Sequence, residues 1–148
     1  MGCCFAKSKL KATNINDNFK IQIKEPINIL YVEDVEIYYN LMKHIFEKYI
    51  NLNVNLIWKK NVKDAYESIE NDNIDVIFID RILENEMGDD LINRLIDEKK
   101  FDISKIIIIS SVDNLKDIES YIELGISYFM KPLDMKLFIK NMMQIFHI

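Results

Sequence analysis

The amino-acid sequence predicts an α/β fold in which a parallel sheet is covered by helices on both faces. From Ile27 onward, short apolar runs alternate with longer segments of helical period, which is typical of this class. Most of the short runs are nearly continuously apolar, as expected for strands covered on both faces. The chain has 148 residues and 49% hydrophobic residues, which predicts one domain with a single core and leaves no room for a second.

Five strands and five helices are expected in strict alternation. The strands are predicted at residues 27–32, 54–58, 75–79, 105–110 and 126–130. The helices are predicted at residues 35–49, 62–71, 88–99, 114–124 and 134–146. Right-handed crossovers between such pairs give a flavodoxin-like, doubly wound sheet of five parallel strands in the order 2-1-3-4-5. Ligands bind these sheets at the carboxyl ends of the strands, so we expect the functional residues there.

The first and last helices have the clearest apolar stripes. In the first, apolar side chains recur every four residues and are expected to face the sheet: Ile37, Leu41, Ile45 and Tyr49. In the last, the corresponding side chains are Leu137, Phe138, Met142 and Ile145.

Charge is unevenly distributed along the chain. The formal net charge is -5, and residues 1–24 carry five lysines and one aspartate, so the remainder is strongly acidic. An acidic folded part argues against nucleic-acid binding, which usually requires a basic face. Weak periodicity in residues 1–25 predicts a flexible basic N-terminal tail, followed by a folded domain over residues 26–148.

The two cysteines, Cys3 and Cys4, are adjacent near the N-terminus and cannot form a disulfide framework or a metal cluster. Their placement favours a reducing, cytoplasmic environment. No apolar run reaches the length of about 18 residues that a membrane span needs, so the folded part is expected to be soluble.

Polar side chains follow four of the five predicted strands. They are Glu33 and Asp34 after the first, Asp80 after the third, Ser110 at the end of the fourth with Ser111 after it, and Lys131 after the fifth. Three carboxylates that converge at one edge repel one another unless a cation intervenes. Ligand sets made only of oxygen favour Mg²⁺ over zinc, so these residues predict a magnesium site.

The order and spacing of these residues resemble the receiver domains of two-component response regulators over residues 27–148. The segments that carry the resemblance are Leu30-Tyr31-Val32-Glu33-Asp34, Asp75-Val76-Ile77-Phe78-Ile79-Asp80, Ser110 after the isoleucine run, and Tyr128-Phe129-Met130-Lys131-Pro132. The resemblance implies a single-domain signalling protein that is not an enzyme in the ordinary sense. Asp80 would receive a phosphoryl group from a histidine kinase or a phosphotransfer protein, forming an acyl phosphate.

The resemblance also implies how the reaction is supported. Asp34 and Asp80 would hold Mg²⁺ directly, Glu33 would act through water, and Ile82 would contribute its backbone carbonyl. Lys131 would pair with Asp80 and then with the bound phosphoryl group, because an ammonium can follow a moving negative charge.

In receivers, a hydroxyl residue moves toward the phosphoryl group and an aromatic side chain turns into the space that it leaves. These roles fall to Ser110 and Tyr128, which together would form the switch. The surface that changes would comprise the last two helices and the strand between them, with Tyr121 and Ile122 beside Tyr128. With no further domain expected, the output would be binding to a downstream protein whose identity the sequence does not give.

Two glycines and one proline agree with the resemblance. Gly88 stands where receivers usually have a glycine before the third helix, and Gly125 is expected to end the fourth helix. The bond between Lys131 and Pro132 is usually cis in this family. The chain departs from the pattern at Glu84, where receivers commonly have a proline. Val112, two residues after Ser110, occupies a position that tunes dephosphorylation, and an apolar side chain there is expected to slow hydrolysis.

Other interpretations of the same residues stay open. Glu33 and Asp34 could cap the following helix, Tyr128 could simply fill the core, and Lys131 could be an ordinary exposed lysine. The chain could then be an interaction module that works without phosphorylation, or a metal-dependent phosphatase of related topology. His44 and His147 have no ligand partners at useful spacing and are interpreted as structural or surface residues.

The N-terminus, Met1-Gly2-Cys3-Cys4-Phe5-Ala6-Lys7-Ser8, resembles an N-myristoylation signal with neighbouring cysteines suited to palmitoylation. Acylation at Gly2, Cys3 and Cys4 together with the lysines would anchor the protein to a membrane, because two acyl signals bind far more stably than one. Ala6 departs from the signal, which prefers serine or threonine at that position. The interpretation applies only in a eukaryote.

Overall fold

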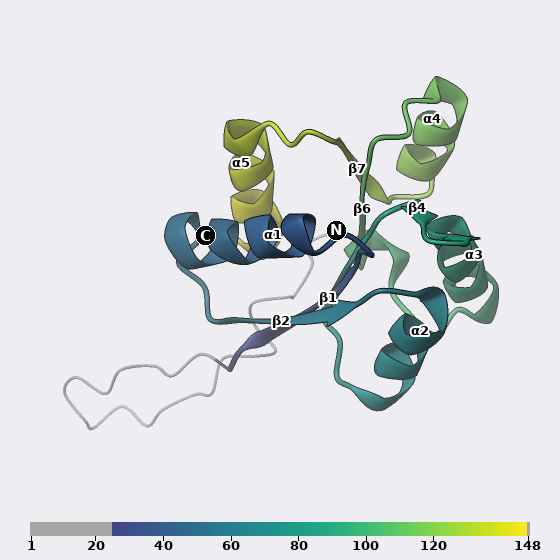
Figure 1. Cartoon of the computed structure of the whole chain (residues 1–148), viewed down its shortest axis with the longest axis horizontal. Coiled ribbons are helices and arrows are strands. Elements are labelled where there is room, and N and C mark those ends of the chain that lie inside the picture. The colour runs from purple at the N-terminus through teal and green to yellow at the C-terminus, as the bar shows by residue number, and fades with distance from the viewer. Residues whose placement is uncertain (1–24, 148) are drawn as a thin grey trace.

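A computed structural model describes residues 25–147 of the chain (Figure 1). Its centre is a five-stranded parallel sheet in the order β2-β1-β3-β6-β7, which confirms the predicted flavodoxin-like topology. Helices α1 and α5 cover one face of the sheet, and α2, α3 and α4 lie on the other side. Within the described residues, no helix is both long and apolar enough to cross a membrane.

The observed elements lie close to the predicted ones. The strands of the sheet are β1 (Ile27–Val32), β2 (Val54–Lys59), β3 (Val76–Ile79), β6 (Ile106–Ser110) and β7 (Ser127–Met130). The helices are α1 (Glu36–Tyr49), α2 (Val62–Asn71), α3 (Gly88–Glu98), α4 (Leu115–Glu123) and α5 (Met135–Phe146). The sequence interpretation did not foresee a small antiparallel hairpin of β4 (Ile82–Leu83) and β5 (Glu86–Met87), nor a 3₁₀ turn, η1 (Ile103–Lys105).

Capping residues explain why two helices start one residue later than predicted. The side chain of Asn114 accepts a hydrogen bond from the backbone N–H of Asp117, and that of Asp134 accepts one from Leu137. Each residue is therefore an N-cap with extended backbone, which satisfies one of the free N–H groups of the first turn and precedes the helix proper.

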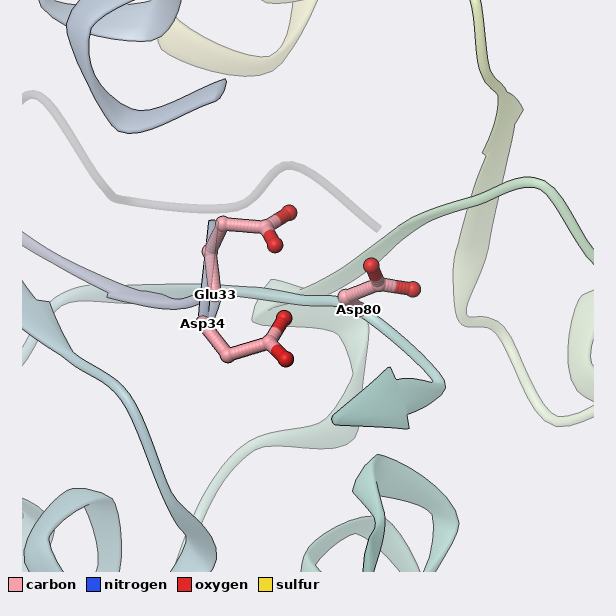
Figure 2. A group of neighbouring side chains, drawn as sticks. All are labelled: Glu33, Asp34 and Asp80. Carbon is pink, nitrogen blue, oxygen red and sulfur yellow. The ribbon is translucent and has the colours of Figure 1, made fainter. Parts of the chain in front are cut away.

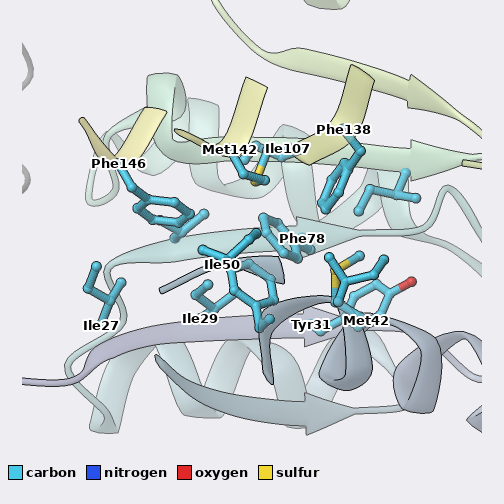
Figure 3. Packing of buried hydrophobic residues seen from close by; sticks show 14 residues of the cluster. Ile27, Ile29, Tyr31, Met42, Ile50, Phe78, Ile107, Phe138, Met142 and Phe146 are labelled. Atoms are coloured by element: carbon cyan, nitrogen blue, oxygen red, sulfur yellow. The ribbon is translucent and has the colours of Figure 1, made fainter. Parts of the chain in front are cut away.

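The sheet separates two buried clusters of different composition. The cluster under α1 and α5 is rich in aromatic rings, and Figure 3 shows Phe78 of the central strand between side chains of β1 and those of α5. The opposite cluster, under α2 and α3, consists almost entirely of aliphatic side chains. The continuous apolar runs of the strands follow from this double coverage, because both faces of each central strand must be buried.

The predicted core face of α1 is wrong in detail. Ile37 is 69% exposed, and Leu41 and Tyr49 are exposed too, whereas Met42 and Phe46 join Ile45 in the core. A step of four residues turns about 40° beyond a full helical turn, so a stripe of such steps winds off the buried face. The buried face instead follows mixed steps of three and four.

In α5 the same error affects one residue. Leu137 is 53% exposed, while Phe138 and Met142 are buried as predicted and Phe146 completes the buried face.

Candidate functional site

Three carboxylates meet at the carboxyl edge of the sheet. Glu33 and Asp34 follow β1 directly, and Asp80 follows the neighbouring strand β3. Val32 pairs with Ile79, and the backbone N–H of Asp80 donates to the carbonyl of Val32 at 3.0 Å, so the strand register itself brings the acids together. Carboxylate oxygens of the three residues lie within 4.8 Å of one another (Figure 2).

Glu33 is fully buried at this edge. Its carboxylate accepts hydrogen bonds from Lys131 Nζ at 2.6 Å, from the backbone N–H of Val35 at 3.1 Å and from the hydroxyl of Tyr31 at 3.4 Å. Burial raises the pKa of Glu33 above its ordinary value, although the hydrogen bonds oppose the rise. The loss of water around the carboxylate therefore changes the pKa of Glu33 more than its hydrogen bonds do.

Lys131 bridges two of the acids. Its Nζ lies 2.7 Å from Asp80 Oδ2 and 2.6 Å from Glu33 Oε2, and the ring of Tyr38 lies against the ammonium at 3.7 Å. Burial alone would lower the pKa of Lys131, but the two carboxylates raise it above its ordinary value. The lysine is thus a charged group held in a nearly dry position between buried acids.

Backbone geometry fixes the position of this lysine. The N–H of Lys131 donates to the carbonyl of Ser110 at 2.9 Å, which continues the pairing of β7 with β6 by one residue. The bond between Lys131 and Pro132 is cis, as the resemblance implied.

The site has the donors of a hard-cation site. Asp34 is half-buried, and it lies beside Asp80, whose Oδ1 accepts a hydrogen bond from the backbone N–H of Ile82 at 3.2 Å. The candidate ligands are all oxygen atoms, and Lys131 alone cannot neutralise three carboxylates. This donor set suits Mg²⁺.

Gly88 allows α3 to begin close to the backbone of Asp80. A Cβ atom on this residue would stand 2.0 Å from the backbone oxygen of Asp80, closer than any side chain permits. The hairpin β4–β5 returns the chain to this point, and the N–H of Gly88 donates to the carbonyl of Arg81 at 2.8 Å. The glycine is therefore required by a close approach of two backbone segments.

A hydroxyl and a phenol lie at the ends of the next two strands. Ser110 is fully buried at the end of β6, and its Oγ accepts a long hydrogen bond from the N–H of Val112 at 3.4 Å. Tyr128 of β7 is half-buried and donates its hydroxyl proton to the carbonyl of Val112 at 2.6 Å. Both side chains thus contact the backbone of the same loop between β6 and α4.

Residues 29–142 match the response regulator receiver domain family. The chain belongs to this family. Receiver domains are modules of two-component systems, and the topology and the acidic edge described above agree with that membership. The match begins within β1, includes the other four strands of the sheet and ends within α5.

Solved receiver domains share the fold at low sequence identity. The receiver domain of the Francisella response regulator 1452 is 22% identical with a TM-score of 0.68, and the similarity covers 82% of this chain and 97% of the other. The HemR receiver domain from Leptospira biflexa is 22% identical with a TM-score of 0.68, covering 84% and 96%. A two-component response regulator from Clostridium difficile is 18% identical with a TM-score of 0.68, covering 82% and 96%. No curated protein sequence matches this receiver domain.

The remaining residues singled out from the sequence are more scattered. Tyr121 of α4 stacks beside Tyr128 with ring centroids 6.5 Å apart, whereas Ile122 is exposed on that helix. The N-terminal residues Gly2, Cys3 and Cys4 lie outside the described residues.

Sequence reasoning missed a buried charge next to Asp80. Arg81 is almost fully buried, and its guanidinium contacts carboxylates of both α3 and α4. Burial alone would lower the pKa of Arg81, but hydrogen bonds to Asp89, Tyr128 and Asp117 raise it. Asp89 and Asp117 lie 8 and 36 residues away along the chain, and no periodic signal links them to Arg81.

The chain's single tryptophan was also overlooked. Trp58 of β2 donates its indole N–H to the carbonyl of Glu33 at 2.6 Å and stacks on Tyr39 with centroids 4.6 Å apart. It therefore contacts the backbone of the acidic edge.

Proposed function

We propose that this receiver domain accepts a phosphoryl group on Asp80 from a histidine kinase or a phosphotransfer protein and signals by altered binding to a downstream protein. The observation that carries the proposal is the placement of Asp80 at the carboxyl end of the central strand, with an ammonium 2.7 Å from its carboxylate and two further acids beside it. A nucleophilic carboxylate, a mobile cation and metal-binding oxygens are the parts that this transfer requires.

In the proposed step a carboxylate oxygen of Asp80 attacks phosphorus. An O–P bond forms as the bond between phosphorus and the donor's histidine nitrogen breaks, and the nitrogen keeps the electron pair. The product is an acyl phosphate. The domain is thus a phosphoacceptor that promotes only its own modification and its own dephosphorylation.

The acidic side chains would bind the cation that phosphoryl transfer requires. Asp34 and Asp80 would hold Mg²⁺ directly, with Glu33 acting through water and Ile82 through its backbone carbonyl. When bound, the cation would neutralise negative charge on the transferring oxygens. The full burial of Glu33 and its hydrogen bonds to Lys131 and Val35 support an indirect role for this residue.

Lys131 would follow the negative charge from the Asp80 carboxylate to the new phosphoryl oxygens. Ser110 would donate a hydrogen bond to one of those oxygens, and Tyr128 would turn inward in response. The contact of both side chains with the loop at Val112 supports this coupling, because movement of one backbone segment affects both.

The test is phosphorylation by a small donor. The chain is incubated with acetyl phosphate and Mg²⁺, and its intact mass and the fluorescence of Trp58 are followed. We expect one added phosphoryl group, sensitive to hydroxylamine, and a fluorescence change that also follows addition of beryllofluoride. Asp80→Asn should abolish both responses, and omission of Mg²⁺ should abolish phosphorylation.

An interaction module that works without phosphorylation would show neither response while keeping its fold. That result would overturn the proposal. The chain would then act by binding alone.

Membrane anchoring through Gly2, Cys3 and Cys4 is a separate proposal that rests on the N-terminal sequence alone. Mass spectrometry of the protein from its native host would detect the acyl chains. An unmodified Gly2 with both cysteines free would contradict membrane anchoring by acylation. That result would not bear on the proposed phosphoacceptor function.

A further inference from the structure

Helix α4 is attached to the domain differently from the other helices. It is the one α-helix in the described part of the chain that contains no buried residue, and Leu115 and Ile122 are exposed. It lies at the outer edge of the molecule beside β7, which is itself an edge strand (Figure 1). Apolar burial therefore contributes little to holding α4 in place, and its polar contacts matter correspondingly more.

Those polar contacts converge on Arg81. The guanidinium forms a bidentate pair with Asp89 of α3, with Nη2 2.9 Å from Oδ2 and Nε 3.2 Å from Oδ1, and Nη2 also lies 3.0 Å from Asp117 Oδ2 of α4. The Arg81 side chain is 7% exposed and that of Asp89 18%, so this pair is largely shielded from bulk water, whereas Asp117 is 46% exposed. One buried cation thus joins the first turns of two helices.

Two tyrosines belong to the same group of contacts. Tyr121 of α4 donates its hydroxyl proton to Asp89, and its ring lies 5.3 Å from the guanidinium carbon of Arg81. The hydroxyl of Tyr128 lies 3.5 Å from Arg81 Nη1 while it donates to the carbonyl of Val112. The guanidinium consequently contacts both α4 and the aromatic side chain that the proposed function assigns to the switch.

The backbone connects this group to the acceptor. Arg81 follows Asp80 directly, and the next N–H, that of Ile82, donates to the Asp80 carboxylate. The carbonyl of Arg81 accepts from Gly88 at the start of α3. A rearrangement at the Asp80 carboxylate therefore acts on the segment that carries the guanidinium.

We propose that Arg81 is a positioning residue of the switch: by pairing with Asp89 and Asp117 it holds α4 against α3 and keeps Tyr128 in its present orientation until Asp80 is modified. The part that concerns α4 is independent of phosphorylation, and the part that concerns Tyr128 rests on the proposed function. Without the guanidinium, the carboxylates of Asp89 and Asp117 have no cation between them, and α4 is held against α3 only by the hydroxyl of Tyr121 on Asp89 and by little apolar contact.

The first experiment measures amide hydrogen exchange across the full chain without any phosphoryl donor. In Arg81→Met and Asp117→Asn we expect α4 amides to exchange about 10-fold faster than in the wild type, with Arg81→Lys in between because an ammonium cannot pair as a fork. The matched control is Arg94→Met, which removes an exposed arginine of α3 paired only within that helix and stacked on Tyr66. Asp117 is half-exposed, so its variant is expected to fold even if Arg81→Met does not.

The outcome that overturns the α4 part is unchanged protection of α4 in Asp117→Asn, or an equal acceleration in α3 and β3, which would indicate general destabilisation. This measurement uses no phosphoryl analogue. Its result therefore stands even if the domain proves unable to accept a phosphoryl group.

The second experiment follows Tyr128 by ¹⁹F NMR of 3-fluorotyrosine-labelled protein, with the signal assigned through Tyr128→Phe. In wild type, beryllofluoride and Mg²⁺ should shift the Tyr128 signal. In Arg81→Met the signal should move toward that shifted position before any addition, and Arg81→Lys should restore part of the difference. A Tyr128 signal that stays at the wild-type position in both Arg81→Met and Asp117→Asn overturns the switch part of the proposal. If the Tyr128 signal of the wild type does not shift on addition of beryllofluoride and Mg²⁺, the proposed function is overturned instead.

Discussion

The chemistry of this receiver domain depends on a few side chains with little freedom. Lys131 is held by Glu33 on one side and Asp80 on the other, so movement toward a phosphoryl group on Asp80 need not break its pair with Glu33. Glu33 then acts as a fixed anchor for the lysine as well as part of the acidic edge. Replacing Lys131 alone would leave two buried carboxylates without a cation, whereas replacing either acid leaves the lysine one carboxylate partner.

Gly88 and Gly125 are both required, for different physical reasons, and this difference can be measured. Gly88→Ala places a Cβ against the Asp80 carbonyl and should cost about 3 kcal/mol of unfolding free energy. Gly125→Ala meets open space but must keep a φ of 91°, and should cost about 1 kcal/mol. Urea denaturation monitored by Trp58 fluorescence would compare them, and equal losses would contradict the close approach at Asp80.

Val112 provides a prediction about the lifetime of the acyl phosphate. Its backbone contacts Ser110 and Tyr128, while its side chain is half-buried in the loop after β6. Val112→Asn should shorten the phosphoryl half-life, because a polar side chain there can orient the attacking water. Loss of the added mass is timed after removal of acetyl phosphate, with Asp113→Asn as the neighbouring control. An unaltered phosphoryl half-life in Val112→Asn would contradict the proposed effect of residue 112 on hydrolysis.

At the scale of elements, the loop after Asp80 forms a hairpin attached to α2, with Glu84 at the position where receivers commonly have a proline. The carboxylate of Glu86 accepts the backbone N–H of Val62 at 2.7 Å, which satisfies a free N–H in the first turn of that helix. Glu84 is exposed at the turn of the same hairpin. One carboxylate of the hairpin therefore anchors it to the start of α2.

Glu86→Ala should accordingly destabilise the domain by about 1 kcal/mol, because it removes both a capping bond and a favourable charge at a helix N-terminus. Glu84→Ala is the matched control and should change stability by less than about 0.5 kcal/mol. Urea denaturation gives both values, and hydrogen exchange at Val62 reports the bond itself. If the Val62 amide exchanges equally in wild type and Glu86→Ala, the attachment is absent in solution.

Elements with long regular patterns could be predicted from the sequence, and short or irregular ones could not. The apolar runs located every strand of the sheet, and the polar residues that follow those runs correctly indicated that Glu33, Asp34, Asp80 and Lys131 share one edge. The hairpin β4–β5 has two-residue strands, which carry no periodicity. Arg81 was missed because its partners come from separate helices, and only the folded chain brings them together.

At the scale of the whole molecule, the two faces of the sheet support different tasks. The face under α1 and α5 is packed with aromatic rings around Phe78, whose centroid lies 6.0 Å from those of Tyr31 and Phe46 and 6.2 Å from that of Phe138. The other face ends at α4, which buries no residue completely. The tightly packed half thus supports β3, the strand that leads to Asp80, whereas the half that carries α4 has fewer buried contacts to hold it.

This division predicts where truncation of a side chain costs most. Phe78→Ala should lose about 4 kcal/mol of unfolding free energy, because the cavity opens at the centre of the aromatic cluster and rigid neighbours cannot fill it. Phe78→Leu should lose about 1.5 kcal/mol of unfolding free energy. This variant replaces the alanine variant in the comparison if the latter is too unstable to measure. Leu137→Ala is the matched control: the residue was expected in the core from its helical pattern, but it is exposed, so the loss should stay under about 0.5 kcal/mol. Urea denaturation of the three variants decides the matter, since comparable losses for Phe78→Leu and Leu137→Ala would place Leu137 in the core after all.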